Sequence, residues 1–188
     1  MKLIVIAVLL CAEAIRVSSD CPTIISRNRW GAKPPKQVQT IRLPVEYVVI
    51  HHSATPTCLD EDACSKRLIS IQNYHMDVLK YNDISYSFMV GGDGKIYEGV
   101  GWNKQGSHTT PQWDSRSIGI GFIGNFTVEP PQKDALDVAQ QLIKCGVAIG
   151  VVQADYKLLG ARSLKPTESP GDALYKEIQN WDGFVRSP

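Results

Sequence analysis

The sequence predicts an α/β fold in which a central mixed β-sheet is flanked by three helices. Short runs rich in β-branched and aromatic residues, which are typical of strands, recur along the chain. Longer stretches have apolar residues three or four positions apart, the spacing of an amphipathic helix. Strands interleaved with helices in this way indicate helices packed on one sheet. The 188 residues, 43% of them hydrophobic, suit a single domain with a sizeable core.

Five segments are expected to form strands, because each is rich in valine, isoleucine, tyrosine, leucine or phenylalanine. They are residues 46–51, 85–90, 95–98, 118–123 and 156–159. Gly91-Gly92-Asp93-Gly94 separates the second from the third. Glycine and aspartate tolerate a positive φ, so this segment predicts a hairpin turn.

Three segments are expected to form helices. Two of them, residues 63–80 and 131–150, have apolar stripes made of Leu68, Ile71, His75 and Leu79, and of Leu136, Ala139, Ile143 and Gly146. The third helix is predicted to begin at Ser169-Pro170-Gly171-Asp172, with Leu174, Ile178 and Trp181 on its apolar side. There Ser169 is expected to be the N-cap, Pro170 the first helical residue and Asp172 the partner that completes a capping box.

Residues 1–19 have the features of a secretory signal. Met1-Lys2 gives a charged start, residues 3–12 form an apolar run, and small residues precede Cys21. The run is too short to span a bilayer, for which roughly 20 apolar residues are needed. We therefore expect a secreted, extracellular protein with no membrane segment, whose single domain spans residues 20–188.

The expected mature domain has balanced charges. Removal of residues 1–19 takes away two basic residues and one acidic residue, and it leaves 18 of each kind. A domain that binds nucleic acid is expected to carry a basic face. The charge balance therefore argues against nucleic acid as a partner.

Four cysteines remain in the expected mature chain: Cys21, Cys58, Cys64 and Cys145. An even number of cysteines in a secreted chain favours two disulfides. Cys58 and Cys64 are near enough to close a short loop, which leaves Cys21 to pair with Cys145. The alternative, a metal site built from cysteines, has no C-x-x-C pair to support it. Asn125-Phe126-Thr127 matches the acceptor pattern for N-glycosylation.

Six stretches in a fixed order carry a family resemblance. They are Arg29-Trp30-Gly31-Ala32, Val49-Ile50-His51-His52-Ser53, Asp83-Ile84-Ser85-Tyr86, Gly91-Gly92-Asp93-Gly94-Lys95-Ile96-Tyr97-Glu98-Gly99, Ser117-Ile118-Gly119-Ile120 and Ser169-Pro170-Gly171. In this order they resemble the peptidoglycan recognition proteins, over nearly the whole chain from Cys21 to Trp181. That family is related to phage lysozymes that are zinc-dependent N-acetylmuramoyl-L-alanine amidases. The resemblance implies the peptidoglycan recognition, or type 2 amidase-like, fold. The length and the signal resemble the short secreted branch known from insects and vertebrates.

The resemblance also implies where a zinc site would lie. In amidase members, zinc is held by the first histidine of the His-His pair, a histidine in a Gly-His-Arg stretch and a cysteine before Pro-Gly. Here those positions are His51, Ala161 and Ser169. Alanine has no donor atom and a serine hydroxyl is a poor zinc ligand beside a thiolate, so we expect no zinc, no other cofactor and no amidase activity. Tyr86 matches the tyrosine that assists the amidase reaction, and Thr167 lies where the family has threonine or lysine.

Ser169 has a second interpretation. A serine near a histidine can act as a nucleophile, and His51 would lie near Ser169 if the geometry of the amidase site persists. The alternative function is therefore a residual serine-type peptidoglycan peptidase that uses these two residues.

Muramyl peptides are long, polar and partly sugar, so a groove lined with histidine, tyrosine and tryptophan suits them. Aromatic rings stack on apolar faces while their polar atoms form hydrogen bonds. The expected lining residues are His51, His52, His75, Tyr86, Trp102 and His108. His75 has a structural alternative, because it lies on the apolar side of its helix. In the family a histidine at this place faces the groove, which favours binding.

The third residue of a peptidoglycan stem peptide is either L-lysine or meso-diaminopimelate, which carries an extra carboxylate. A fixed guanidinium can bind that carboxylate through two hydrogen bonds. Members that resemble diaminopimelate binders have Gly-Trp before the groove tyrosine and an arginine after Tyr-Glu-Gly. This chain has Lys80-Tyr81 and Val100 at those places. Valine cannot pair with a carboxylate, so the sequence favours lysine-type peptidoglycan, with Lys80 as the remaining cation able to bind some carboxylate.

The expected function is that of a secreted pattern-recognition receptor of innate immunity that binds bacterial peptidoglycan without hydrolysing it. The resemblance to short insect members with an incomplete zinc site implies that the signal of Gram-positive bacteria passes to a partner recognition protein. A serine-protease cascade upstream of Toll would follow. A structural or hormone-like protein on the same fold is the third alternative, and it predicts no affinity for muropeptides.

Overall fold

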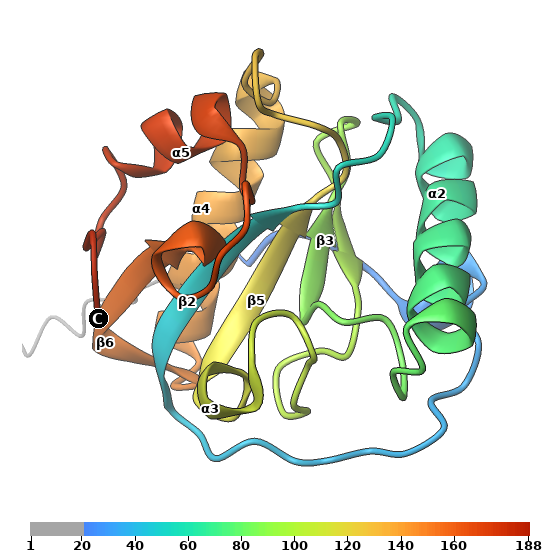
Figure 1. The fold of residues 1–188 in the computed structure, drawn as a ribbon, viewed down its shortest axis with the longest axis horizontal. Coiled ribbons are helices and arrows are strands. Elements are labelled where there is room, and N and C mark those ends of the chain that lie inside the picture. Colours follow the sequence, from blue (N-terminus) through green and yellow to red (C-terminus); the bar gives the residue numbers. More distant parts are fainter. Residues whose placement is uncertain (1–20) are drawn as a thin grey trace, which may run out of the picture.

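Six strands form one sheet at the centre of the molecule (Figure 1). The computed structural model describes residues 21–188, so the expected signal sequence lies outside the described residues. The strands are β1 (Ile24–Ile25), β2 (Val45–His52), β3 (Phe88–Val90), β4 (Ile96–Glu98), β5 (Ser117–Phe122) and β6 (Val152–Gly160). Their order across the sheet is β1-β4-β3-β5-β2-β6. Only β3 and β4 pair antiparallel, and the other pairs are parallel. The predicted mixed sheet is thus confirmed.

Helices cover both faces of this sheet (Figure 1). They are α1 (Arg27–Trp30), α2 (Glu61–Asn73), which continues as the π-helix η1 (Tyr74–Val78), α3 (Pro111–Asp114), α4 (Lys133–Ala148), the short 3₁₀ helix η2 (Ala161–Ser163) and α5 (Asp172–Ile178). The helix α2 lies on one face, and α4 and α5 lie on the other. The three predicted helices are present as α2 with η1, α4 and α5. The sequence did not predict α1 and α3, since four residues are too few to show a helical period.

The two faces have separate cores, because successive side chains of a strand point to opposite sides. Val48 and Ile50 of β2 pack with residues of α4 and α5. On the other face, Met89 of β3 packs with Leu68 and Ile71 of α2. His51 stands between positions that face α4 and α5, so its side chain points to the face that α2 covers.

Trp30 anchors the N-terminal segment to the sheet. It is 1% exposed, and its indole Nε1 donates to the carbonyl oxygen of Glu98 at 2.8 Å. Gly31 ends α1 with a φ of 80°, a left-handed conformation that glycine adopts without steric cost. The Trp-Gly pair of the first family stretch therefore has a structural role.

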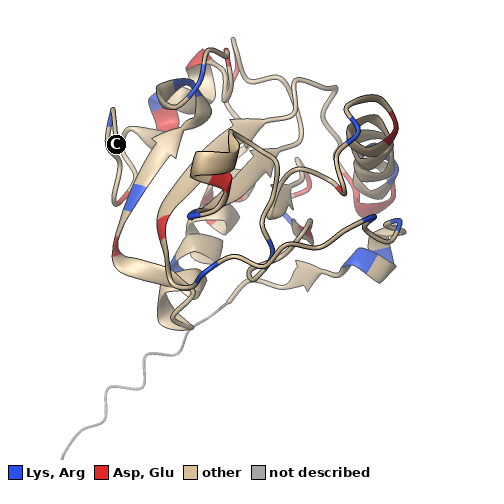
Figure 2. Ribbon diagram, turned by 60° about the horizontal axis from the view of Figure 1, so that its bottom comes forward, with Lys and Arg blue, Asp and Glu red and all other residues tan. Residues whose placement is uncertain are grey.

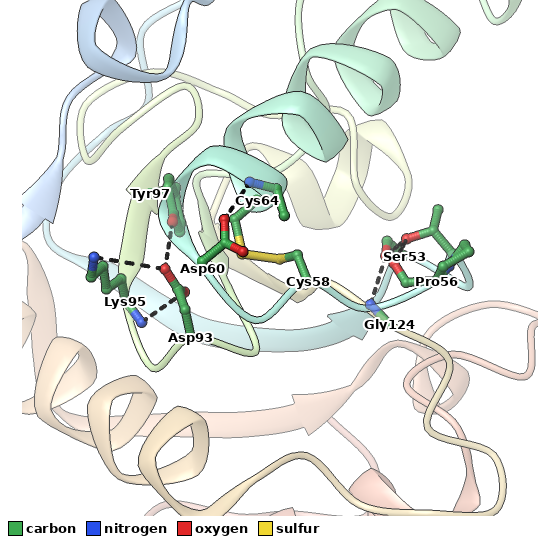
Figure 3. Close-up of a disulfide and its surroundings, with 11 residues drawn as sticks. Ser53, Pro56, Cys58, Asp60, Cys64, Asp93, Lys95, Tyr97 and Gly124 are labelled. Atoms are coloured by element: carbon green, nitrogen blue, oxygen red, sulfur yellow. Dashed lines mark hydrogen bonds and ion pairs between the residues drawn. A yellow bond between two sulfur atoms is a disulfide. The ribbon is translucent and has the colours of Figure 1, made fainter.

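Both predicted disulfides are present, Cys21–Cys145 and Cys58–Cys64. The second ties the loop after β2 to the first turn of α2 (Figure 3). Asp60 caps this turn, because its carboxylate accepts a hydrogen bond from the backbone N–H of Ala63 at 2.8 Å. The loop from Ser53 to Asp60, which borders the site described below, is therefore fixed at its α2 end.

Charges of both signs are spread over the ribbon in Figure 2 rather than gathered on one face. Within residues 21–188, no helix is both long enough and apolar enough to cross a membrane.

Candidate functional site

The three positions that correspond to zinc ligands meet at the ends of neighbouring strands. Ile50 of β2 pairs with Gly160 of β6. The next residue on each of these parallel strands is His51 and Ala161, so these two residues lie side by side. The hydroxyl oxygen of Ser169 accepts a hydrogen bond from the backbone N–H of His52 at 3.1 Å. The fold therefore assembles His51, Ala161 and Ser169 in one place.

These residues do not fit a zinc ion. Ala161 is fully buried and brings a methyl group to the site. The Ser169 hydroxyl is engaged with the backbone of His52, and a neutral hydroxyl is a weak zinc ligand. Only the imidazole of His51 remains as a competent donor. Across residues 21–188, no group of three or more histidine, cysteine, aspartate or glutamate side chains is arranged to hold a metal ion.

His51 instead pairs with His108. Its Nε2 lies 3.2 Å from Nδ1 of His108, and that nitrogen lies 2.9 Å from the hydroxyl of Thr109. Burial lowers the pKa of His51 well below its ordinary value, and the nearby His108 and Lys165 lower it further. Burial, with a contribution from Lys165, lowers the pKa of His108 to about 3. Both rings are therefore neutral at physiological pH, and one ring donates to the other.

A second layer of polar groups holds His108 in place. The carboxylate of Asp114 accepts from the backbone N–H of Thr109 at 2.7 Å, and burial raises the pKa of this carboxyl to about 6. The ammonium of Lys165 donates to the carbonyl oxygens of His108 and Thr109 at 2.9 and 3.2 Å. Neither Asp114 nor Lys165 lies in a motif that the sequence analysis could recognise, and Lys165 reaches these carbonyl oxygens from a segment more than fifty residues away.

Two glycines of β5 make room for the aromatic side chains above them. A Cβ atom at Gly119 would lie 2.5 Å from the ring of His108, and one at Gly121 would lie 2.8 Å from the sulfur of Met89 and 3.1 Å from the ring of Tyr86. A real Cβ atom essentially never lies closer than 3.0 Å to such an atom, so a side chain at either position would force its neighbours to move. The backbone of β5 is therefore in direct contact with these rings.

A groove of about 380 Å³ lies beside the two histidines, between α2 and the sheet. Its lining residues are Ser53, Ala54, Thr55, Ser70, Ile71, Tyr74, His75 and Tyr86. The rings of His51 and Tyr86 are 5.3 Å apart between centroids, which joins the groove to the histidine pair. Burial raises the pKa of Tyr86 to about 12, so its hydroxyl is protonated and able to donate. A concave site lined by aromatic rings and hydroxyl groups suits a ligand that has both apolar faces and polar atoms.

The π-helix η1 turns His75 into the groove. Its Nδ1 accepts a hydrogen bond from the backbone N–H of Ser85 at 3.0 Å, and its ring lies 5.8 Å from Tyr86 and 5.9 Å from Tyr81 between centroids. Burial lowers the pKa of His75 to about 4. The neighbouring Tyr74, which is 53% exposed and lines the groove, was missed because nothing in its pattern separates it from a surface residue.

Two of the predicted groove residues lie elsewhere. His52 is the next residue after His51 on β2 and points to the opposite face, where its Nδ1 accepts from the backbone N–H of Phe126. Trp102 packs on Phe88 at 4.4 Å between centroids, within the core that α4 covers. The interpretation of both as groove residues is wrong, because the sheet separates them from the groove.

The residues predicted to distinguish the stem peptides are also placed by the structure. Val100 is 5% exposed and lines a small pocket of about 30 Å³, in which Lys104 also takes part. Its backbone N–H donates to the carbonyl oxygen of Tyr86, a residue that lines the groove. The ammonium of Lys80 donates to the carbonyl oxygen of Asp77, and this hydrogen bond caps the C-terminal end of η1.

Replacement of Lys80 by glycine is expected to stabilise the protein. Lys80 has a φ of 61°, and the left-handed conformation costs a non-glycine residue about 1–2 kcal/mol. Part of this gain is offset by the larger entropy of unfolded glycine, so Lys80→Gly should raise the free energy of unfolding by about 0.5 kcal/mol. Urea unfolding of both proteins measures this difference in the free energy of unfolding. Lys80→Ala is the matched control, because it removes the ammonium but keeps the strain, and an alanine variant as stable as the glycine variant would contradict the explanation.

Ser169 is not the N-cap of α5. The helix begins at Asp172 after Gly171, and no side chain among residues 21–188 caps it. Asp172 pairs with Arg162 at 2.6 Å instead of completing a capping box. Thr167 has a local role, since its hydroxyl accepts from the backbone N–H of Ser169 at 3.2 Å. The prediction of a cap was wrong because the Ser169 side chain has a distant partner, the backbone of His52.

The peptidase interpretation receives no geometric support. A serine nucleophile needs a base within hydrogen-bonding distance of its hydroxyl. In the described residues the Ser169 hydroxyl contacts the backbone of His52, whereas the Nε2 of His51 faces His108. Ser169 and His51, the expected nucleophile and base, therefore form their hydrogen bonds with other residues and not with each other.

Comparison with known proteins agrees with this geometry. The model of the N-acetylmuramoyl-L-alanine amidase family matches residues 41–172. Peptidoglycan-recognition protein 1 of Holotrichia diomphalia is 57% identical over 178 residues, which cover 94% of this chain and 90% of the relative.

Solved structures show the same likeness. The structure of bumblebee PGRP-SA has a TM-score of 0.87 at 41% identity and covers 89% of this chain and 100% of its own. A chain from the ectodomain complex of PGRP-LCa and PGRP-LCx, which binds tracheal cytotoxin, has a TM-score of 0.86 at 40% identity, with coverage of 88% and 99%. The sequence, the fold and the arrangement of the site together show that this chain belongs to the peptidoglycan-recognition proteins, a family built on the amidase domain.

Proposed function

We propose that this protein is a secreted receptor that binds bacterial peptidoglycan and has no amidase activity. One observation carries the proposal: the groove beside His51 is intact, whereas Ala161 and Ser169 bring no competent metal ligand to the adjoining site. Without a metal ion there is no activated water for hydrolysis. What remains is a site with the shape and lining of a binding groove. The two disulfides and the expected signal sequence support secretion.

The groove itself provides the test of binding. Ser70 is an exposed residue of α2 that lines the groove, so Ser70→Trp fills the groove without disturbing the core. We expect muropeptide affinity to fall by about tenfold or more, which corresponds to at least about 1.4 kcal/mol. Lys144→Trp, an exposed substitution on α4 across the sheet, is the matched control and should bind normally. Isothermal calorimetry measures both variants, and equal affinity for the two would place the ligand elsewhere.

Absence of amidase activity has its own test. The purified protein is expected to contain no stoichiometric zinc and to release no peptide from peptidoglycan by cleavage of the amide bond to muramic acid. Metal analysis and mass spectrometry of the released products measure these two properties. Amidase products that disappear with a chelator would contradict the proposal.

The stem-peptide type that we propose is the lysine type. Val100 brings no charge to the small pocket that it lines, and the ammonium of Lys80 is bonded to the carbonyl oxygen of Asp77 at its own helix end. Burial of the extra carboxylate of diaminopimelate beside Val100 would leave it without a guanidinium partner. Calorimetry with matched lysine and diaminopimelate muropeptides should show tighter binding of the lysine form. A diaminopimelate preference that is lost in Lys104→Met would instead assign the carboxylate to Lys104.

The receptor is further proposed to pass its signal to a partner recognition protein and a serine-protease cascade upstream of Toll. The likeness to PGRP-SA structures and the small secreted form support this role. Addition of the protein with lysine-type peptidoglycan to insect plasma lacking its own receptor should restore protease activation, whereas Ser70→Trp should not.

A further inference from the structure

A second hollow of about 350 Å³ opens on the other side of the loop that borders the groove. Three segments form it: the loop after β2, the end of β3 with Gly91 and Gly92, and the connection between β5 and α4. Phe122, Phe126, Pro130 and Pro131 contribute much of its lining. Leu59 lies in the same lining and is 72% exposed. Apolar surface gathered in one open hollow commonly marks a place where another group binds.

The sequence places a modification signal on the rim of this hollow. Asn125, Phe126 and Thr127 form the acceptor pattern for N-glycosylation, and Asn125 and Phe126 both line the hollow. Asn125 is exposed, whereas Phe126 is only 9% exposed. The middle residue of the pattern is therefore turned into the core and leaves the asparagine accessible.

The local geometry fixes Asn125 while leaving its amide nitrogen available. Its Oδ1 accepts from the hydroxyl of Thr127 at 2.7 Å and from the backbone N–H of the same residue at 3.2 Å. The residue before it is held by a hydrogen bond from the backbone N–H of Gly124 to the hydroxyl of Ser53 (Figure 3). Within residues 21–188, Nδ2 of Asn125 donates to no other residue.

We propose that Asn125 carries an N-linked glycan whose first sugar rings cover this apolar hollow. The donor is an oligosaccharide linked to a lipid pyrophosphate. The bond between Nδ2 of Asn125 and the anomeric carbon forms, the bond from that carbon to the pyrophosphate oxygen breaks, Nδ2 loses one proton, and the lipid pyrophosphate leaves. Pyranose rings have apolar faces, which pack on the exposed apolar side chains of the lining, such as Pro56, Leu59 and Pro130.

The glycan leaves the groove free. The two hollows share only Thr55 in their linings, and the segment from Ser53 to Thr57 runs between them. Loss of the glycan is therefore expected to leave muropeptide affinity unchanged, so this inference and the proposed function are tested separately.

Secretion from insect cells provides the test of attachment. Intact mass and peptide mapping should find a glycan on Asn125 in the natural sequence and in Thr127→Ser, which keeps the acceptor pattern. Thr127→Ala, which removes the pattern and only an exposed side-chain hydrogen bond, should carry none. An unmodified Asn125 in the secreted natural protein would overturn the proposal.

An apolar dye tests the cover. Unglycosylated Thr127→Ala should bind several-fold more dye than the glycosylated protein, with the same circular dichroism spectrum. Gln132 is exposed and lines the hollow, so adding Gln132→Trp to Thr127→Ala should fill the hollow and lower dye binding again. Equal dye binding with and without the glycan, or no effect of the added tryptophan, would show that the glycan does not cover this hollow.

Discussion

The double substitution Ala161→His and Ser169→Cys is expected to give a chain that binds one zinc ion per molecule. The register between β2 and β6 places residue 161 beside His51, and residue 169 is in contact with the backbone of His52. Two new donors would therefore join the one already present, and three protein ligands are the usual number for an open zinc site. For zinc to bind, Nε2 of His51 must exchange its contact with His108 for the metal.

Zinc binding should be measurable as stability. At a free zinc concentration one hundred times the dissociation constant, the free energy of unfolding rises by about 2.7 kcal/mol. For a chain of this size that is a rise in Tm of about 5–10 °C. Each single substitution is a control that supplies only two ligands and should show a much smaller rise. A double variant whose Tm does not respond to zinc, while it remains folded, would mean that the scaffold no longer holds the three positions in metal-binding geometry.

Acid is expected to destabilise the protein through His75. Its pKa is about 4 in the folded chain because the ring is buried, whereas the unfolded ring has the ordinary value near 6.5. The unfolded state therefore takes up the proton first, and stability falls as the pH falls from about 6.5 to about 4. A shift of this size corresponds to a loss of about 2–3 kcal/mol between pH 7 and pH 4.5. Protonation also removes the acceptor for the backbone N–H of Ser85.

His75→Asn isolates this contribution. The asparagine Oδ1 can accept from Ser85 as Nδ1 does, but the amide does not titrate. Urea unfolding at both pH values should show a smaller loss of stability in the variant, by about 2 kcal/mol. Asp114 titrates in both proteins, and because burial raises its pKa to about 6 it acts in the opposite direction, so the difference between the two proteins is the informative quantity. Parallel pH profiles for the two proteins would exclude His75 as the cause.

Regular patterns were sufficient to predict the central elements. The strand β2 and the helices α2 and α4 are long enough to show their periods, and the nearness of Cys58 to Cys64 in the sequence favoured the disulfide arrangement that the structure has. Local patterns failed where a distant partner decides the outcome. Ser169 had every local feature of a helix cap, but its hydroxyl contacts a strand more than one hundred residues away in the sequence.

The second source of error was the face of the sheet to which a side chain points, which decided the wrong predictions for His52 and Trp102. His51 and His52 both carry imidazoles, but alternation along β2 places only the side chain of His51 on the face of the sheet where the groove lies. The period of two along a strand was available as a signal and would have separated them. No such signal existed for Trp102, whose contact with α4 depends on how the chain turns after β4. Tyr74 and Lys165 owe their positions to the π-helix and to a loop, neither of which has a sequence period.

The glycines of β5 divide the candidate site into a floor that tolerates no side chain and walls in which residues can be exchanged. Under His108 and Tyr86 the floor is bare backbone, and any side chain at Gly119 or Gly121 would displace the rings above it. Ser70 and Tyr74, by contrast, stand on the exposed side of the helical wall, where one residue can be exchanged for another without disturbing the core. New ligand preferences in this fold are therefore expected to arise from substitutions in the walls, over a floor that stays the same.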